Sequence, residues 1–166
     1  MSVVIVKPEN ISIMKKYFLM AATLFIFSAA ASAQSKGRTY TTALGVKFLD
    51  GGGITLKHFV NDKAALEGIA YFWSHGTRIT GLYELHFDIN GAPGLKWYVG
   101  PGAHVGLYNT KYGGGSWIGI DGVLGLDYKI NNAPLNLSLD WQPSFEFGTG
   151  RGFTGNWGGL GIRYTF

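Results

Sequence analysis

Gly161-Ile162-Arg163-Tyr164-Thr165-Phe166 is the stretch of sequence that decides the fold. Apolar or aromatic side chains occupy every second position, at Ile162, Tyr164 and Phe166, and small or polar residues lie between them. A period of two gives a strand one apolar face and one polar face. In a soluble protein such a strand would be an exposed edge, whereas a closed membrane barrel pairs its last strand with its first. The stretch therefore predicts the closing strand of a membrane barrel.

The N-terminal residues have the features of a secretory signal peptide. Met14-Lys15-Lys16 precedes an apolar run over residues 17–30, and Ala31-Ser32-Ala33 follows it. A charged start, a short apolar run and a small-x-small site are typical of a cleaved signal, and the run is short for a membrane-spanning helix of about 20 residues. We expect cleavage after Ala33, so that residues 1–33 are leader and residues 34–166 form one domain. The unusual residues 1–13 suggest Met14 as the true start.

Composition excludes several classes of site. The chain has no cysteine, so it has neither disulfides nor thiolate metal ligands. Its net charge of +4 includes three lysines and one glutamate from the expected leader, so the mature chain is less basic and nothing favours nucleic-acid binding. No cofactor motif is present: the glycine runs at residues 51–53 and 113–115 lack the helix and Lys-Ser/Thr of a phosphate loop.

Turn residues divide the mature chain into eight segments of strand length. We expect strands over residues 40–49, 54–60, 65–74, 78–89, 95–108, 116–130, 135–147 and 157–166. The turns Asn90-Gly91-Ala92-Pro93 and Asn131-Asn132-Ala133-Pro134 share the pattern Asn-x-Ala-Pro, which indicates repeated turn chemistry. An even number of antiparallel strands returns both ends of the domain to one side, which in outer-membrane barrels is the periplasm.

Alternation along the strands favours a membrane barrel over a soluble one. In residues 135–147, Leu139 and Trp141 share one face while Asp140 and Gln142 share the other. A soluble lipocalin-like barrel would turn the apolar face inward and its charges outward. Only 14% of the residues are charged, however, below the roughly 25–35% typical of a water-facing surface. The fold class we predict is all-β: an eight-stranded antiparallel up-and-down transmembrane β-barrel preceded by a cleaved signal peptide.

The same parity assigns polar side chains to the interior. An eight-stranded barrel is only just wide enough for side chains to fill, so opposite charges there should pair and leave no open pore. The predicted polar network of the lumen is Lys47, Arg78, Glu84, His86, Asp88, Lys96, His104, Asp121, Asp127, Lys129, Asp140, Glu146 and Arg163. Residues 54–60 and 65–74 alternate poorly, which suggests a bulge there or a partly aromatic interior.

Aromatic residues near the strand ends are candidates for two membrane-interface girdles. The outer girdle would contain Phe48, Phe72, Trp117, Phe147 and Trp157. The periplasmic girdle would contain Tyr40, Phe87, Trp97, Tyr128, Tyr164 and Phe166.

Several segments resemble small outer-membrane barrels of Gram-negative bacteria, of the OmpA/OmpX type, and most closely the outer-membrane β-barrel domain proteins of Bacteroidota. They are Trp97-Tyr98-Val99-Gly100-Pro101-Gly102, residues 136–143 and residues 159–166. The resemblance implies an outer-membrane location, contact with membrane lipid and lipopolysaccharide, and a monomer. Ile162, Tyr164 and Phe166 resemble the C-terminal signal read by the outer-membrane insertion machinery. That machinery and periplasmic chaperones would be transient partners. The resemblance brings no catalytic residues.

Three functions are compatible with the sequence. We expect a structural or envelope-maintenance barrel with no catalysis, and the alternative is a narrow channel for small solutes. A lipid-modifying enzyme would depend on Ser74 and His75. Neighbours on a strand point to opposite faces, so the two could not meet unless the loop bends back, and no hydrolase motif is present. His86 and His104 could hold a metal with Asp88 or Asp121; hydrogen bonding in the interior is the preferred interpretation.

Overall fold

The structure is a computed structural model that describes residues 40–49, 51–109, 111, 115–148 and 151–166. The predicted leader, with its start at Met14 and its cleavage site after Ala33, lies outside the described residues. Eight antiparallel strands follow one another: β1 (Thr42–Leu49), β2 (Gly51–Phe59), β3 (Ala64–Trp73), β4 (Gly76–Asp88), β5 (Leu95–Tyr108), β6 (Gly115–Lys129), β7 (Leu135–Phe147) and β8 (Phe153–Thr165). Each pairs with its neighbour in the chain.

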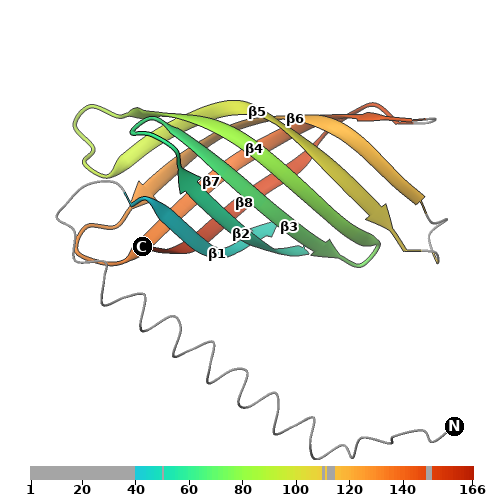
Figure 1. The fold of residues 1–166 in the computed structure, drawn as a ribbon, viewed down its shortest axis with the longest axis horizontal. Coiled ribbons are helices and arrows are strands. Elements are labelled where there is room, and N and C mark those ends of the chain that lie inside the picture. Colours follow the sequence, from blue (N-terminus) through green and yellow to red (C-terminus); the bar gives the residue numbers. More distant parts are fainter. Residues whose placement is uncertain (1–39, 50, 110, 112–114, 149–150) are drawn as a thin grey trace, which may run out of the picture. The chain divides into compact units, whose positions relative to one another are not determined.

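The strands close into a barrel, as the C-terminal stretch predicts (Figure 1). β8 pairs with β1 in antiparallel register from Ala43 opposite Thr165 to Phe48 opposite Leu160. The Phe166 amide donates a hydrogen bond of 2.8 Å to the Thr42 carbonyl, so the pairing continues to the last residue. Because closure leaves no free edge, every strand finds its hydrogen-bond partners within the barrel.

Both ends of the barrel domain lie at one end of the cylinder (Figure 1). We call this end the terminal rim; it also contains the turns at residues 60–63, 89–94 and 130–134. The opposite end, called the distal rim, contains the connections from β1 to β2, β3 to β4, β5 to β6 and β7 to β8. β8 begins at Phe153, four residues before the predicted start, because Phe153 and Thr154 already pair with Phe145 and Ser144 of β7.

The two Asn-x-Ala-Pro turns use the same geometry. Gly91 and Asn132 occupy the same position in the two turns and both have left-handed backbones, with φ of 82° and 61°. In each turn the following alanine amide bonds the isoleucine carbonyl three residues earlier, Ala92 to Ile89 at 3.1 Å and Ala133 to Ile130 at 3.4 Å. Glycine and asparagine are the residues that tolerate this conformation best, so the repeat is one of turn chemistry.

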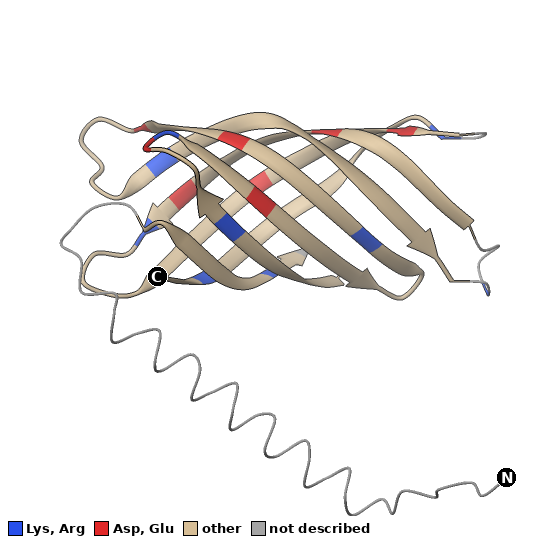
Figure 2. Ribbon diagram, viewed as in Figure 1, with Lys and Arg blue, Asp and Glu red and all other residues tan. Residues whose placement is uncertain are grey.

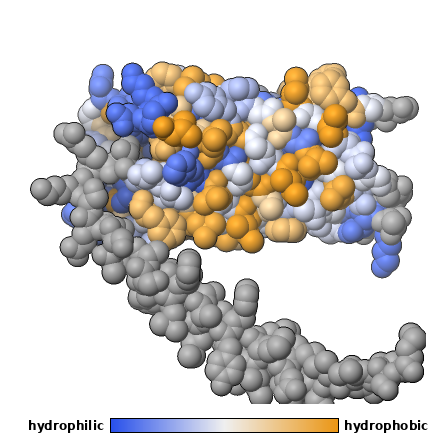
Figure 3. Space-filling view, viewed as in Figure 1, coloured by the Kyte–Doolittle hydropathy of each residue, from blue (hydrophilic) through white to orange (hydrophobic). Residues whose placement is uncertain are grey.

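Burial alternates along the strands with the polar face inward. Charged residues such as Lys47 and Arg78 have no exposed surface, whereas Leu139 is 58% exposed on the outer wall. Hydrophobic residues cover most of the middle of the visible face, and hydrophilic ones gather mainly toward its ends (Figure 3). The parity predicted from β7 is therefore confirmed for the barrel.

Of the two explanations for the poor alternation predicted in β2 and β3, the bulge is wrong and the partly aromatic interior is confirmed. β2 and β3 pair without interruption from Gly52 opposite Phe72 to Phe59 opposite Ala65, and the aromatic residues Phe59 and Tyr71 are buried at inward positions. The register shift lies instead between β7 and β8, at Gln142 and Ser144, where Pro143 cannot donate to the sheet.

Some of the predicted girdle aromatics lie inside the barrel. Tyr40 and Trp117 are only 6% and 5% exposed, and Trp157 packs its ring against Tyr71 and Trp73. The alternation of side chains along the strand points these residues inward. Whether an aromatic residue faces outward therefore depends on this alternation as well as on its position near a strand end. Of the predicted girdle residues, those exposed on the outer wall are Phe48, Phe72, Phe87, Trp97, Tyr128 and Phe147.

Candidate functional site in the barrel interior

Side chains from all eight strands fill the interior, and most of the largest are polar or charged. Arg78, Arg163, Lys47 and Lys57 are each completely buried, as is Glu84. Acidic and basic residues are spread along the strands between the two rims (Figure 2). In the described part of the chain their buried ion pairs form two groups, which we call the terminal network and the distal network.

Lys57 of β2 is one centre of the terminal network. Its Nζ lies 2.7 Å from Glu84 Oε2, 3.4 Å from Glu67 Oε2 and 3.5 Å from Asp127 Oδ2. The Tyr40 hydroxyl donates to the same Asp127 oxygen at 2.9 Å, and His86 Nε2 lies 2.9 Å from Glu84 Oε2. One ammonium group thus holds together three carboxylates from three other strands.

Arg163 of β8 is the second centre. Its guanidinium forms an ion pair with Glu67 and donates to Thr55 Oγ1 at 3.2 Å. It also donates to Ser138 Oγ at 2.8 Å and to Asn136 Oδ1 at 3.1 Å. A planar guanidinium suits this role because its donors point in fixed directions toward several acceptors. Arg163 therefore ties the closing strand to β2, β3 and β7.

Asp140 of β7 extends the terminal network toward the middle of the barrel. Its carboxylate lies 2.5 Å from Lys47 Nζ and accepts hydrogen bonds from the Tyr98 hydroxyl at 2.6 Å and Gln142 Nε2 at 2.8 Å. Lys47 Nζ is also 3.7 Å from Glu67 Oε1. Removing one member would leave its partners charged and enclosed, which costs about 3–5 kcal/mol for a buried pair.

An apolar layer follows the terminal network along three strands. Leu82 lies between Arg78 and Glu84 on the inward face of β4, and Val123 lies between Asp121 and Asp127 on β6. Ile69 follows Glu67 on β3. These three residues pack with Tyr71 and Tyr98 into one buried cluster. The layer therefore separates the charges of the two networks along the barrel axis.

The distal network is centred on Asp121 of β6. Arg78 forms an ion pair with its carboxylate, and His104 Nδ1 lies 2.9 Å and 3.0 Å from its two oxygens. Glu146 Oε1 is farther away, at 4.0 Å from Arg78 Nη1 and 3.8 Å from His104 Nε2. The Arg78 guanidinium also lies over the Trp157 ring, with Cζ 4.2 Å from the centroid.

Arg151, in the connection from β7 to β8, closes the distal network. Its Nη1 donates to Glu146 Oε2 at 3.0 Å. Its guanidinium lies over the rings of Trp117 and Tyr108, with Cζ 4.4 Å and 5.1 Å from their centroids. The cation thus contacts a carboxylate and lies beside the stacked pair of Tyr108 and Trp117.

Three of the predicted interior residues lie at the terminal rim instead. The Asp88 side chain is 81% exposed and pairs with Lys96 at 3.1 Å. Lys129 is half-buried and donates to the Ile130 and Ala133 carbonyls at 3.0 Å and 2.5 Å, within the turn from β6 to β7. All three have inward parity but sit at the strand ends, where the barrel opens. The remaining predicted residues lie in the two networks: Lys47, Arg78, Glu84, His86, His104, Asp121, Asp127, Asp140, Glu146 and Arg163.

Sequence reasoning missed Lys57 and Glu67, which make most of the contacts in the terminal network. Both lie in β2 and β3, whose alternation was obscured by inward Phe59 and Tyr71. A strict count of every second residue from Thr55 would have found Lys57, because parity does not change along an unbulged strand.

The condition under which Ser74 and His75 can meet, a loop that bends back, is fulfilled. The connection from β3 to β4 bends so that Ser74 Oγ lies 2.8 Å from His75 Nδ1, although both side chains are exposed. The pair is held from the next hairpin, since Asn109 donates its amide to the His75 carbonyl at 2.8 Å. His86 and His104 lie in different networks, and among the described residues no group of three His, Asp or Glu side chains could hold a metal ion.

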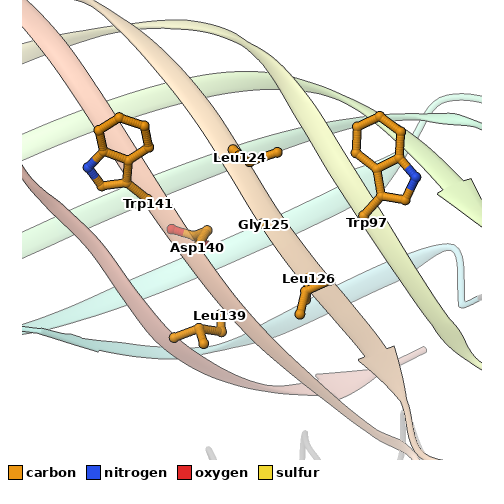
Figure 4. Close-up of a pocket in the computed structure, with 7 residues that line it drawn as sticks. All are labelled: Trp97, Leu124, Gly125, Leu126, Leu139, Asp140 and Trp141. Atoms are coloured by element: carbon orange, nitrogen blue, oxygen red, sulfur yellow. The ribbon is translucent and has the colours of Figure 1, made fainter. Parts of the chain in front are cut away.

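The outer wall has a depression of about 460 Å³ among residues of β5, β6 and β7 (Figure 4). It lies between Trp97 and Trp141 and is lined mainly by Leu124, Leu126 and Leu139. Gly125 provides its floor, with the Tyr98 ring against the inner side of that glycine. Most of its lining is apolar, and it also includes Asp140, whose carboxylate belongs to the terminal network.

The comparisons give this chain no relatives: no protein-family model, no curated protein and no solved structure matches it. Within the described residues no helix has both the length and the apolar character needed to cross a membrane.

Proposed function

We propose that this protein is an integral outer-membrane β-barrel of a Gram-negative bacterium, similar to the OmpA/OmpX type. In this proposal it has a structural or envelope-maintenance role, with a side-chain-filled lumen and no catalysis. The observation that supports this proposal most strongly is that charged side chains face the interior of the barrel and apolar side chains face outward. Lys57 and Arg163 are fully enclosed while Leu139 and Ile118 are 58% and 61% exposed.

Physical reasoning supports a hydrocarbon surrounding. Exposing apolar surface to water costs about 25 cal/mol per Å², and large apolar side chains surround this barrel on every strand. In a bilayer that cost disappears, and a closed barrel also satisfies the backbone groups that lipid cannot. The apolar depression between Trp97 and Trp141 would accept an acyl chain of membrane lipid or lipopolysaccharide.

The proposed orientation places the terminal rim in the periplasm and the distal rim outside the cell, as in barrels with an even number of strands. Ile162 is exposed on the outer wall, and the rings of Tyr164 and Phe166 contact each other at 5.1 Å. We propose that these residues form the signal that the outer-membrane insertion machinery recognises. Periplasmic chaperones would deliver the unfolded chain to that machinery. The folded protein would be a monomer.

Membrane location is tested by fractionating cells that express the full chain. We expect the protein in the outer-membrane fraction, with an electrophoretic mobility that changes on boiling because the folded barrel resists detergent. Recovery as a soluble periplasmic protein would overturn the proposal.

Contact of the outer face of the barrel with lipid is tested by tryptophan quenching in brominated-lipid vesicles. The variants used each retain a single tryptophan. We expect strong quenching of Trp141 or Trp97, which face outward, and weak quenching of Trp117, which faces inward. Equal quenching of Trp141 and Trp117 would contradict the proposed arrangement.

The filled lumen separates a structural role from the channel alternative. The refolded protein should be silent in planar bilayers, because charged and apolar side chains occupy the interior from Tyr40 to Trp117. Reproducible single-channel conductance would favour a conduit for small solutes. For the lipid-modifying alternative, His75→Ala should leave the lipid profile of the cells unchanged, and a changed profile would indicate catalysis.

A further inference from the structure

We propose that the terminal network is a proton-binding site. At neutral pH the folded barrel holds one proton on Glu84 of β4, and the resulting carboxylic acid donates a hydrogen bond to the charged carboxylate of Glu67 of β3. Neither side chain has any exposed surface. The proton is therefore enclosed by the barrel and leaves when the barrel unfolds.

The charges of the terminal network do not balance without this proton. In the described part of the chain its carboxyl groups are Glu67, Glu84, Asp127 and Asp140, and its permanent cations are Lys47, Lys57 and Arg163. At the nearby rim Lys96 pairs with Asp88 and Lys129 donates to two carbonyls of its turn, so neither supplies the missing cation. An uncompensated charge in an enclosed space is strongly unfavourable, and such a group takes up a proton instead.

Glu84 and Glu67 are neighbours on the inward face of adjacent strands. Glu84 pairs with Ala65 and Glu67 pairs with Leu82, so the two glutamates are diagonal cross-strand neighbours. Their carboxyl groups lie within hydrogen-bonding reach of each other. Glu84 Oε1 and Glu67 Oε2 are both buried and lack a hydrogen bond from any described residue. Two carboxylates this close repel each other, whereas one proton between them gives both oxygens a partner.

The surroundings of the pair place the proton on Glu84. Glu67 forms ion pairs with three cations and accepts a hydrogen bond from Thr55 Oγ1 at 2.5 Å. Glu84 forms an ion pair with one permanent cation, Lys57 at 2.7 Å, which also lies 3.4 Å from Glu67. Nearby positive charge favours the ionised form of a carboxyl group. Glu67 is therefore the carboxylate and Glu84 the acid.

His86 is the other group that could take the proton, and its contacts favour the neutral ring. Its Nε2 lies 2.9 Å from Glu84 Oε2, the oxygen that Lys57 Nζ also approaches. The ring packs against Phe59 and Tyr98, and its buried Nδ1 has no hydrogen-bond partner among the described residues. An imidazolium would carry an N–H at Nδ1 with no acceptor, whereas a neutral imidazole can donate through Nε2 alone.

The proton makes the stability of the barrel depend on pH. Charged and titratable groups surround Glu84 from every strand: Tyr40 before β1, Lys47 of β1, Lys57 of β2, Glu67 of β3, His86 of β4, Tyr98 of β5, Asp127 of β6, Asp140 of β7 and Arg163 of β8. Between about pH 7.5 and about pH 9, an unfolded chain has ionised glutamates, neutral histidines and protonated tyrosines and lysines. The folded barrel then binds one proton more than the unfolded chain, so stability falls as the pH rises.

The first test detects the proton directly by infrared spectroscopy of the full chain refolded in detergent at about pH 7.5, where exposed carboxyl groups are ionised. We expect the carbonyl stretch of a protonated carboxylic acid. It should move when the glutamate side-chain carboxyl carbons are labelled with carbon-13, and it should vanish in Glu84→Gln. Absence of the band, a band that ignores the glutamate label, or a band that persists in Glu84→Gln would overturn the proposal. If Glu84→Gln does not fold, the label in the wild type still separates glutamate from aspartate.

The second test measures urea unfolding between about pH 7.5 and about pH 9, the window in which the difference of one bound proton applies. The unfolding equilibrium constant of the wild type should rise with pH more steeply than that of Glu84→Gln, by up to about tenfold per pH unit. Glu146→Gln makes the same chemical change in the distal network and is the matched control, which should keep the pH dependence of the wild type. Equal pH dependence of the wild type and Glu84→Gln would contradict a proton on Glu84.

Discussion

The terminal and distal networks use the same kinds of charge but differ in how completely the barrel encloses them. Lys47, Lys57, Glu67 and Glu84 have no exposed side-chain surface, and each ammonium group touches at least two carboxylates. In the distal network Glu146 and Arg151 keep contact with solvent, and the pairs joining Glu146 to Arg78 and His104 are 3.8–4.0 Å long.

This difference indicates separate roles for the two halves of the interior. Enclosed and closely paired charges fix the relative positions of strands that are far apart in the chain, and removing one leaves the others without solvent. Partly exposed charges backed by aromatic rings can exchange partners at lower cost. The terminal half is therefore enclosed throughout, whereas among the described charges of the distal half only Glu146 and Arg151 keep contact with solvent.

Glu67→Leu should have the largest effect, because it leaves Arg163, Lys47 and Lys57 with one carboxylate fewer in an enclosed space. We expect a loss of about 3–5 kcal/mol in the free energy of unfolding. The measurement is urea unfolding of the refolded barrel in detergent, followed by the change in gel mobility on boiling. A smaller loss than that of the distal variant Glu146→Leu would mean that the distal network contributes more to stability than the terminal network.

Glu146→Leu is that distal variant. It removes the acceptor of Arg151 and the long contacts to Arg78 and His104, but Asp121 still pairs with both of the buried bases. We expect a loss of about 1.5–3 kcal/mol in the same unfolding experiment, the range for hydrogen bonds to charged groups. A loss as large as that of Glu67→Leu would show that the distal half is equally rigid.

Arg151→Met should cost less than about 1 kcal/mol, because its ion pair is partly exposed and the methionine keeps the packing of the aliphatic stem. Urea midpoints of the variant and the wild type measure this directly. The variant should retain the folded gel mobility, and loss of that mobility would assign Arg151 a structural role.

The smallest expected effect is the energetic coupling between a substitution in the terminal network and one in the distal network. Glu67→Leu and Glu146→Leu should be additive within about 0.5 kcal/mol, because the layer of Ile69, Leu82 and Val123 separates them. As a control, Glu67→Leu and Arg163→Leu remove two groups in direct contact and should be non-additive by about 1 kcal/mol or more. Strong coupling across the layer would contradict the division into two networks.

Much of the fold could be predicted from the sequence because the signals are local. The bounds of β5 and β7 agree with the prediction, since turn residues mark both ends and a period of two fixes the faces. Prediction is weaker where an aromatic side chain occupies an inward position, because its apolar character then disagrees with the alternation along the strand. Inward Phe59 and Tyr71 hid Lys57 and Glu67, and Trp117 and Tyr40 were assigned by their place near a strand end instead of by their face.

The sequence by itself determined the number of strands, the antiparallel order and the polar character of the inner face, because alternation and turn chemistry act over a few residues. Only the tertiary structure decided which charges meet. Arg163 reaches Glu67 from 96 positions away, and Tyr98 reaches Asp140 from 42. Such contacts depend on the stagger of strands at closure, which places inward residues of non-neighbouring strands at the same height.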